Sequence, residues 1–65
     1  MNMNNYRKAK LFQSVQDYPN IVLDYLHYGG SVNIICNNKS LLDEAVKHKN
    51  RTIVKELLRR GAFPQ

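Results

Sequence analysis

The stretch NIVLDYLHYGGSVN, residues 20–33, decides the fold, because the related stretch TIVKELLRRGAFPQ occupies residues 52–65. Ahead of these two stretches, Leu11 and Leu42 also correspond, at an offset of 31. Self-similarity with a period near 32 residues is the signature of stacked helical repeats. The pairs that match at an offset of 32 are Ile21 and Ile53, Val22 and Val54, Leu26 and Leu58, and Gly29 and Gly61.

Apolar residues recur at helical spacing in four separate groups, and each group predicts one short helix. Every group supplies a single apolar stripe, so each helix must pack against a neighbour. The four groups are Leu11, Phe12 and Val15; Ile21, Val22, Tyr25 and Leu26; Leu41, Leu42, Ala45 and Val46; and Ile53, Val54, Leu57 and Leu58.

Residues that start and stop helices fall between these groups. Pro19 suits the first turn of the second helix, and the pair at 29–30, Gly-Gly, ends that helix. Ser40 is a natural N-cap for the third helix, Thr52 is expected to cap the fourth, and Gly61 ends it. Strand signals are weak, and the only stretch that favours β-structure is SVNIIC, residues 31–36.

The order of these residues resembles that of the ankyrin repeat family. SLLDEAVKHKNRTIVKELLRRGAFPQ, residues 40–65, follows the family motif, and KLFQSVQDYPNIVLDYLHYGGSVN, residues 10–33, is similar to an N-terminal capping repeat. The resemblance implies an all-α fold of two stacked helix-turn-helix pairs, a short α-solenoid. The motif positions kept in the second repeat are Ser40, Leu42, Ala45, Ile53, Val54, Leu57, Leu58, Gly61, Ala62 and Pro64.

On this resemblance the chain divides into an N-terminal extension (1–8), a first repeat (9–33) and a link with the second repeat (34–65). The second repeat departs from the motif at Leu41, Asp43 and Phe63, where the family has proline, histidine and aspartate. The link lacks the usual turn glycine. Asn37 or Asn38 is expected to replace it, because asparagine tolerates a positive φ.

Composition narrows the class of protein. The chain has 65 residues and a net charge of +5, and residues 33–65 hold seven of its ten Lys and Arg side chains. Its single cysteine, Cys36, excludes an internal disulfide and fits a reducing compartment, so we expect a cytoplasmic protein. No apolar run approaches the roughly 18 residues that span a membrane, so no membrane association is expected.

No arrangement of residues predicts catalysis. His27 and His48 lie in different repeats, without a Cys, Ser or carboxylate at motif spacing, and both are expected at the surface. Cys36 is expected to act as a small apolar residue. The sequence GGS at 29–31 ends a helix and does not form a phosphate-binding loop. We therefore expect a protein that is not an enzyme and that needs no cofactor or metal.

Three surfaces are candidates for binding a partner. The link and the concave side that the resemblance implies contain Ile34, Ile35, Asn37, Asn38, Lys39, Asp43, Lys47 and His48. A basic patch contains Lys49, Arg51, Lys55, Arg59 and Arg60. The third surface is aromatic and contains Tyr18, Tyr25, Tyr28 and His27, with Tyr6 upstream. Tyr25 is expected in the core, whereas Tyr28 is expected to be exposed and to anchor a partner.

These features favour a small interaction module that binds a protein with an acidic surface, as an adaptor or a blocking inhibitor. The alternative is a basic nucleic-acid-binding protein of the helix-turn-helix kind, which the net charge also permits. A further expectation concerns the C-terminal repeat, which has no third repeat to cover it. Leu57 or Leu58, together with Phe63, is expected to pack against a partner or against another copy in a homo-oligomer.

Overall fold

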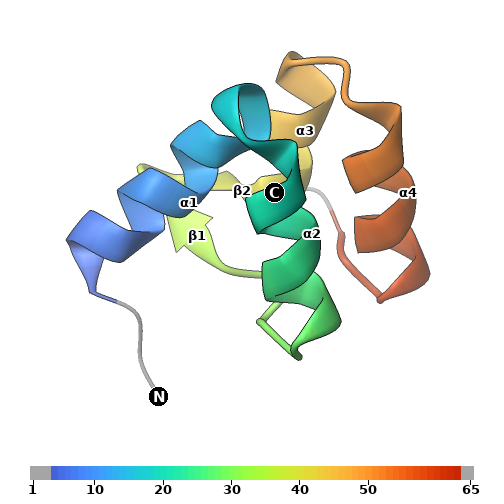
Figure 1. Ribbon diagram of the computed structural model, residues 1–65, viewed down its shortest axis with the longest axis horizontal. Coiled ribbons are helices and arrows are strands. Elements are labelled where there is room, and N and C mark those ends of the chain that lie inside the picture. The colour runs from blue at the N-terminus through green and yellow to red at the C-terminus, as the bar shows by residue number, and fades with distance from the viewer. Residues whose placement is uncertain (1–3, 64–65) are drawn as a thin grey trace.

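The computed structural model describes residues 4–63, which form four α-helices and one two-stranded antiparallel hairpin (Figure 1). Helix dominates, as the sequence predicts, and the hairpin is an addition to the expected all-α fold. Pro64, one of the motif positions, lies outside the described residues, as do residues 1–3. In chain order the elements are α1 (Asn5–Asp17), α2 (Pro19–His27), β1 (Ile35–Cys36), β2 (Lys39–Ser40), α3 (Leu41–Lys47) and α4 (Arg51–Arg59).

The first helical pair begins earlier than expected and breaks where expected. The side chain of Asn4 accepts a hydrogen bond from the backbone N–H of Arg7 at 2.8 Å, so α1 starts at Asn5, inside the segment 1–8 that the sequence predicts as an extension. Tyr18, with φ −143° and ψ 69°, separates α1 from α2, and Pro19 occupies the first turn of α2. Gly29, at φ +90°, ends the pair.

The link between the two pairs is a tight β-hairpin. Ile35 pairs with Ser40 and Cys36 with Lys39, so only Asn37 and Asn38 form the loop. Their φ angles of 53° and 64° are those of a two-residue turn with both central residues left-handed. The expectation that asparagine replaces the turn glycine is confirmed, at both positions. The hairpin itself was missed because its turn is Asn-Asn rather than Asn-Gly.

The second pair is fixed by side-chain caps at both helix starts. Ser40 and Asp43 form a reciprocal capping box on α3, with hydrogen bonds of 3.1 Å and 3.0 Å. The α4 cap is Asn50, whose side chain accepts from the Ile53 N–H at 3.1 Å, so the prediction of Thr52 as the cap is wrong. Thr52 lies one residue inside the helix, because the α3–α4 turn needs only the residues 48–50.

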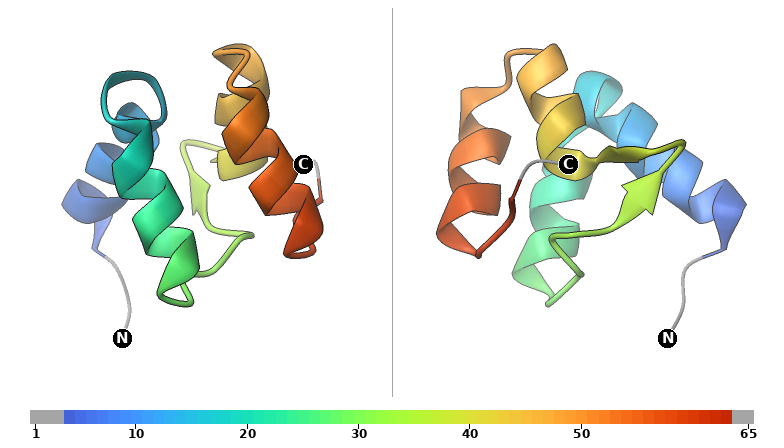
Figure 2. Two further views of the ribbon diagram at one scale, coloured as in Figure 1. Left: turned by 45° about the vertical axis from the view of Figure 1, so that its right-hand side comes forward. Right: turned by 180° about the vertical axis from the view of Figure 1, so that it is seen from behind.

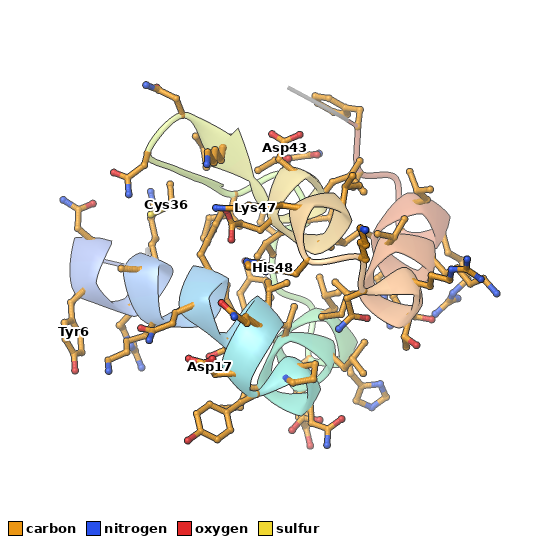
Figure 3. The ribbon with its side chains drawn as sticks, turned by 90° about the horizontal axis from the view of Figure 1, so that it is seen from above. Tyr6, Asp17, Cys36, Asp43, Lys47 and His48 are labelled. Atoms are coloured by element: carbon orange, nitrogen blue, oxygen red, sulfur yellow. The ribbon has the colours of Figure 1, made fainter. Side chains whose placement is uncertain are left out.

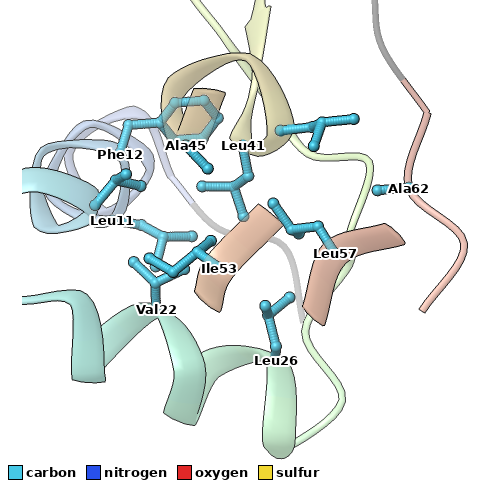
Figure 4. Packing of buried hydrophobic residues seen from close by; sticks show 11 residues of the cluster. Leu11, Phe12, Val22, Leu26, Leu41, Ala45, Ile53, Leu57 and Ala62 are labelled. Atoms are coloured by element: carbon cyan, nitrogen blue, oxygen red, sulfur yellow. The ribbon is translucent and has the colours of Figure 1, made fainter. Parts of the chain in front are cut away.

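The two pairs lie as two layers, with α1 against α3 and α2 against α4 (Figure 2). Their facing sides bury one apolar core, in which Phe12 and Ala45 join α1 to α3 while Leu26 and Leu57 join α2 to α4 (Figure 4). A polar bond also crosses the layers: the Nη1 atom of Arg60 donates to the Leu26 carbonyl oxygen at 3.0 Å. The same carbonyl, in the last turn of α2, also accepts a hydrogen bond from the Gly29 N–H at 3.1 Å.

Candidate functional site

The outer face of the second pair exposes apolar residues that have buried counterparts in the first pair. Val15, Val22 and Leu26 of the first layer are at most 1% exposed, because α3 and α4 cover them. The equivalent residues of the second layer are Val46, Val54 and Leu58. Val46 and Leu58 are 58% and 53% exposed, and Val54 is half-buried. Within residues 4–63, the second layer thus repeats a helix-packing surface that no helix covers.

A groove runs across this outer face, and we call it the α3–α4 groove. It has a volume of about 430 Å³, with Val46 and Val54 as its apolar lining. Leu58 lies one helical turn beyond Val54 and continues the apolar stripe along α4. Three cations complete the lining: Lys49, Arg51 and Lys55.

The basic patch predicted from the sequence divides into two parts. Glu56 Oε2 lies 2.9 Å from Arg59 Nη2 and 3.1 Å from Arg60 Nε, so these two arginines are paired within the protein. The hydrogen bond from Arg59, followed by that from Arg60, holds the pKa of Glu56 below its ordinary value, and the same contact raises the pKa of Arg59. Within residues 4–63, Lys49, Arg51 and Lys55 have no such acidic neighbour.

Half of the predicted link surface serves the fold instead. Ile34 is half-buried against the core, Ile35 is half-buried as well, and Asp43 is engaged in the capping box. His48 is half-buried, with its Nε2 atom 3.3 Å from Glu44 Oε2, so the expectation of a surface histidine is wrong for this residue. Figure 3 shows Asp43, Lys47 and His48 along α3, far from Tyr6 at the opposite end of α1.

The remaining link candidates are exposed: Asn37, Asn38, Lys39 and Lys47. The prediction that the C-terminal repeat is left uncovered needs one correction. Leu57 is 0% exposed and belongs to the core, because its side of α4 faces α2. Leu58 and Phe63, at 53% and 56% exposed, are the residues that stay open.

The first layer exposes an aromatic face, and Ile21 is the residue of it that the sequence did not predict. Tyr6, Tyr18 and Ile21 are all more than half exposed, and they line a groove of about 560 Å³ with Arg7 and Lys10. Ile21 was grouped with the inward stripe of α2, but the buried side of that helix is the one that carries Val22 and Leu26. Ile21 corresponds to Ile53, which is buried, but the buried stripe of α4 starts one residue earlier than that of α2, so the equivalence does not place Ile21 in the core.

Two further tyrosines beside this face have defined surroundings. The Tyr25 hydroxyl donates to the Ser31 carbonyl oxygen at 2.8 Å, and burial raises the pKa of Tyr25 despite that bond. Tyr28 is 84% exposed, as predicted, and its ring meets the exposed ring of His27 edge-on, with 5.3 Å between the centroids.

The described part of the chain contains no group of three or more His, Cys, Asp or Glu side chains that could hold a metal ion. Cys36 is half-buried and packs against the core, in line with the apolar role expected for it. None of the four helices in residues 4–63 is long and apolar enough to cross a membrane. Comparison of the chain with protein-family models, with curated proteins and with solved structures found no match.

Proposed function

We propose that this chain is a small, non-catalytic interaction module that binds an acidic surface of another protein. One observation carries the proposal: each acidic side chain of the second layer is engaged within the molecule, whereas most of its cations are not. Asp43 caps α3, Glu44 pairs with His48, and Glu56 pairs with Arg59 and Arg60. The cations left without an ion pair in residues 33–63 are Lys39, Lys47, Lys49, Arg51 and Lys55.

The proposed type of module is a pair of ankyrin repeats. Support comes from the arrangement of two helical hairpins in stacked layers, with a β-hairpin between them and a left-handed glycine at the end of each pair. Such a scaffold offers a surface without a catalytic centre, so the module works by occupying its partner. An adaptor would leave a second surface of the partner free, and a blocking inhibitor would cover the partner's active surface.

The second candidate is a nucleic-acid-binding protein, which the same unpaired cations would suit. The apolar residues between those cations favour a protein instead. Val46 and Leu58 are more than half exposed on the outer face of the second layer. Phosphate contacts gain nothing from an aliphatic surface, whereas the buried centre of a protein interface is apolar.

Affinity capture from the protein's own cells, with and without nuclease treatment, tests the proposed function. We expect a protein to be recovered in both samples and to be released at high salt, because exposed charge pairs are screened. Recovery of nucleic acid alone, together with a gel shift of duplex DNA that weakens steeply with salt, would contradict it and support the second candidate.

A further inference from the structure

The contact between the two layers shows what kind of surface the α3–α4 groove fits. In that contact, Val22 and Leu26 of α2 meet the side of α4 that carries Ile53 and Leu57, and all four side chains are at most 1% exposed. These four residues pair one aliphatic stripe, with residues four apart, against another. The equivalents of the first two lie on the neighbouring side of α4, where Val54 lines the α3–α4 groove and Leu58 follows one turn beyond it.

The occupant of the groove must therefore be a helix with aliphatic residues four positions apart. The nine residues of α4 extend for about 13 Å, so two to three turns of a partner helix cover its length. The rim adds a second requirement. Lys49, Arg51 and Lys55 line the groove without an ion pair within the described chain, so acidic side chains on the partner would complement them.

A second copy of this chain meets neither requirement, because the exposed apolar residues of its α1–α2 face are Tyr6, Tyr18 and Ile21, without an exposed aliphatic pair four positions apart. In a stack of copies, the α1–α2 face of one molecule would cover the α3–α4 groove of the next, and Ile21 would take the place that Ile53 has in the core. That face also carries Arg7 and Lys10, so the contact would bring two cationic surfaces together. Repulsion between molecules of net charge +5 acts in the same direction.

We propose that the α3–α4 groove docks an acidic amphipathic helix of a partner protein. The inference rests on the proposed function and specifies the partner segment: a helix with aliphatic residues at i and i+4, flanked by Asp or Glu. The helix lies over Val46 and Val54, extends to Leu58, and places its carboxylates against Lys49, Arg51 and Lys55.

A synthetic peptide of about 14 residues, long enough for four helical turns, provides the probe. It carries leucines at i, i+4 and i+8 and glutamates beside them, and its control peptide has lysine in place of each glutamate. The full chain, labelled with ¹⁵N, is titrated with each peptide. We expect the acidic peptide to shift the amide signals of Val46, Val54 and Leu58, and the lysine peptide to leave them in place.

Two variants and a matched control examine the residues of the site. Lys55→Glu should weaken binding of the acidic peptide about fivefold or more, and Lys8→Glu, an equal charge change on α1, which lines no part of the groove, should leave the affinity nearly unchanged. Leu58→Gln should also weaken binding while the chain stays folded, since Leu58 is already 53% exposed.

Four results would overturn the proposal: no binding, equal binding of both peptides, shifts confined to the hairpin residues 35–40, or self-association that Leu58→Gln abolishes. The third of these leaves the proposed protein-binding function intact and moves its site to the link. Failure of that function itself appears in a different experiment, as capture of nucleic acid without any protein.

Discussion

Replacing Lys49 tests how much a strained backbone conformation lowers the stability of the fold, separately from the effect of the side chain's charge. Lys49 follows the C-terminal residue of α3 and its cap, and it adopts a φ of 56°, although it is neither glycine nor asparagine. A left-handed conformation costs a residue with a side chain about 1–2 kcal/mol. Glycine avoids that cost but gains more freedom in the unfolded chain, which offsets roughly 0.5–1 kcal/mol. Lys49→Gly should therefore raise the free energy of unfolding by about 0.5–1 kcal/mol.

Urea and thermal unfolding followed by circular dichroism measure this gain. For a chain of 65 residues, the gain corresponds to a rise in Tm of about 2–8 °C. Lys49→Ala removes the same charge and keeps the left-handed strain, so it should show no comparable increase. Lys47→Gly, in the last turn of α3, should lower stability by roughly 0.5–1 kcal/mol because it weakens a helix. A Lys49→Gly variant no more stable than Lys49→Ala would refute the reasoning.

Three further predictions concern the contacts that hold the layers. Gly30→Ala should destabilise the fold by about 1–3 kcal/mol, because a Cβ at this position collides with the Tyr25 ring. In urea unfolding, the same substitution should cost less stability when Tyr25 is replaced by leucine. An equal loss of stability in both backgrounds would contradict this cause. Arg60→Met should lower the free energy of unfolding by about 0.5–1.5 kcal/mol through loss of the hydrogen bond to the Leu26 carbonyl oxygen. An unchanged free energy in urea unfolding would show that this hydrogen bond does not stabilise the fold. Because the pKa of Glu56 is lowered in the folded state, its pairing stabilises the fold above the ordinary carboxyl pKa of about 4.3, and that contribution disappears as the pH falls through the folded pKa. Carboxyl titration by NMR should show the pKa of Glu56 rising in Arg59→Gln, and an unshifted pKa would contradict the assignment.

Most helix boundaries follow from local chemistry in the sequence. Pro19, Ser40 and Gly61 act as predicted, because a proline at a helix start, a serine cap and a left-handed glycine need only their immediate neighbours. The cap of α4 was misassigned because Asn50 and Thr52 are both capping residues two positions apart. Only the length of the α3–α4 turn, where Lys49 takes a positive φ, decides between them.

The exposed surfaces that are candidates for binding were harder to predict, since they depend on which side of each helix the other layer covers. The stripe of α4 contains both Leu57 and Leu58, and the sequence does not distinguish the buried leucine from the open one. The division of the basic patch was missed for a similar reason. Glu56 is three residues from Arg59 and four from Arg60, but it is also adjacent to Lys55, and the pairing becomes clear only with the rotamers in place.

Site-specific photo-crosslinking tests most directly the central claim, that the outer face of the second layer binds a protein. A photoreactive residue is placed at Leu58, on the α3–α4 side, and separately at Tyr28, which is exposed at the end of α2. Irradiation in the protein's own cells should attach Leu58 to a partner protein, and mass spectrometry should locate the bond in an acidic helical segment. Protein crosslinks from Tyr28 alone, or crosslinks only to nucleic acid, would contradict the claim.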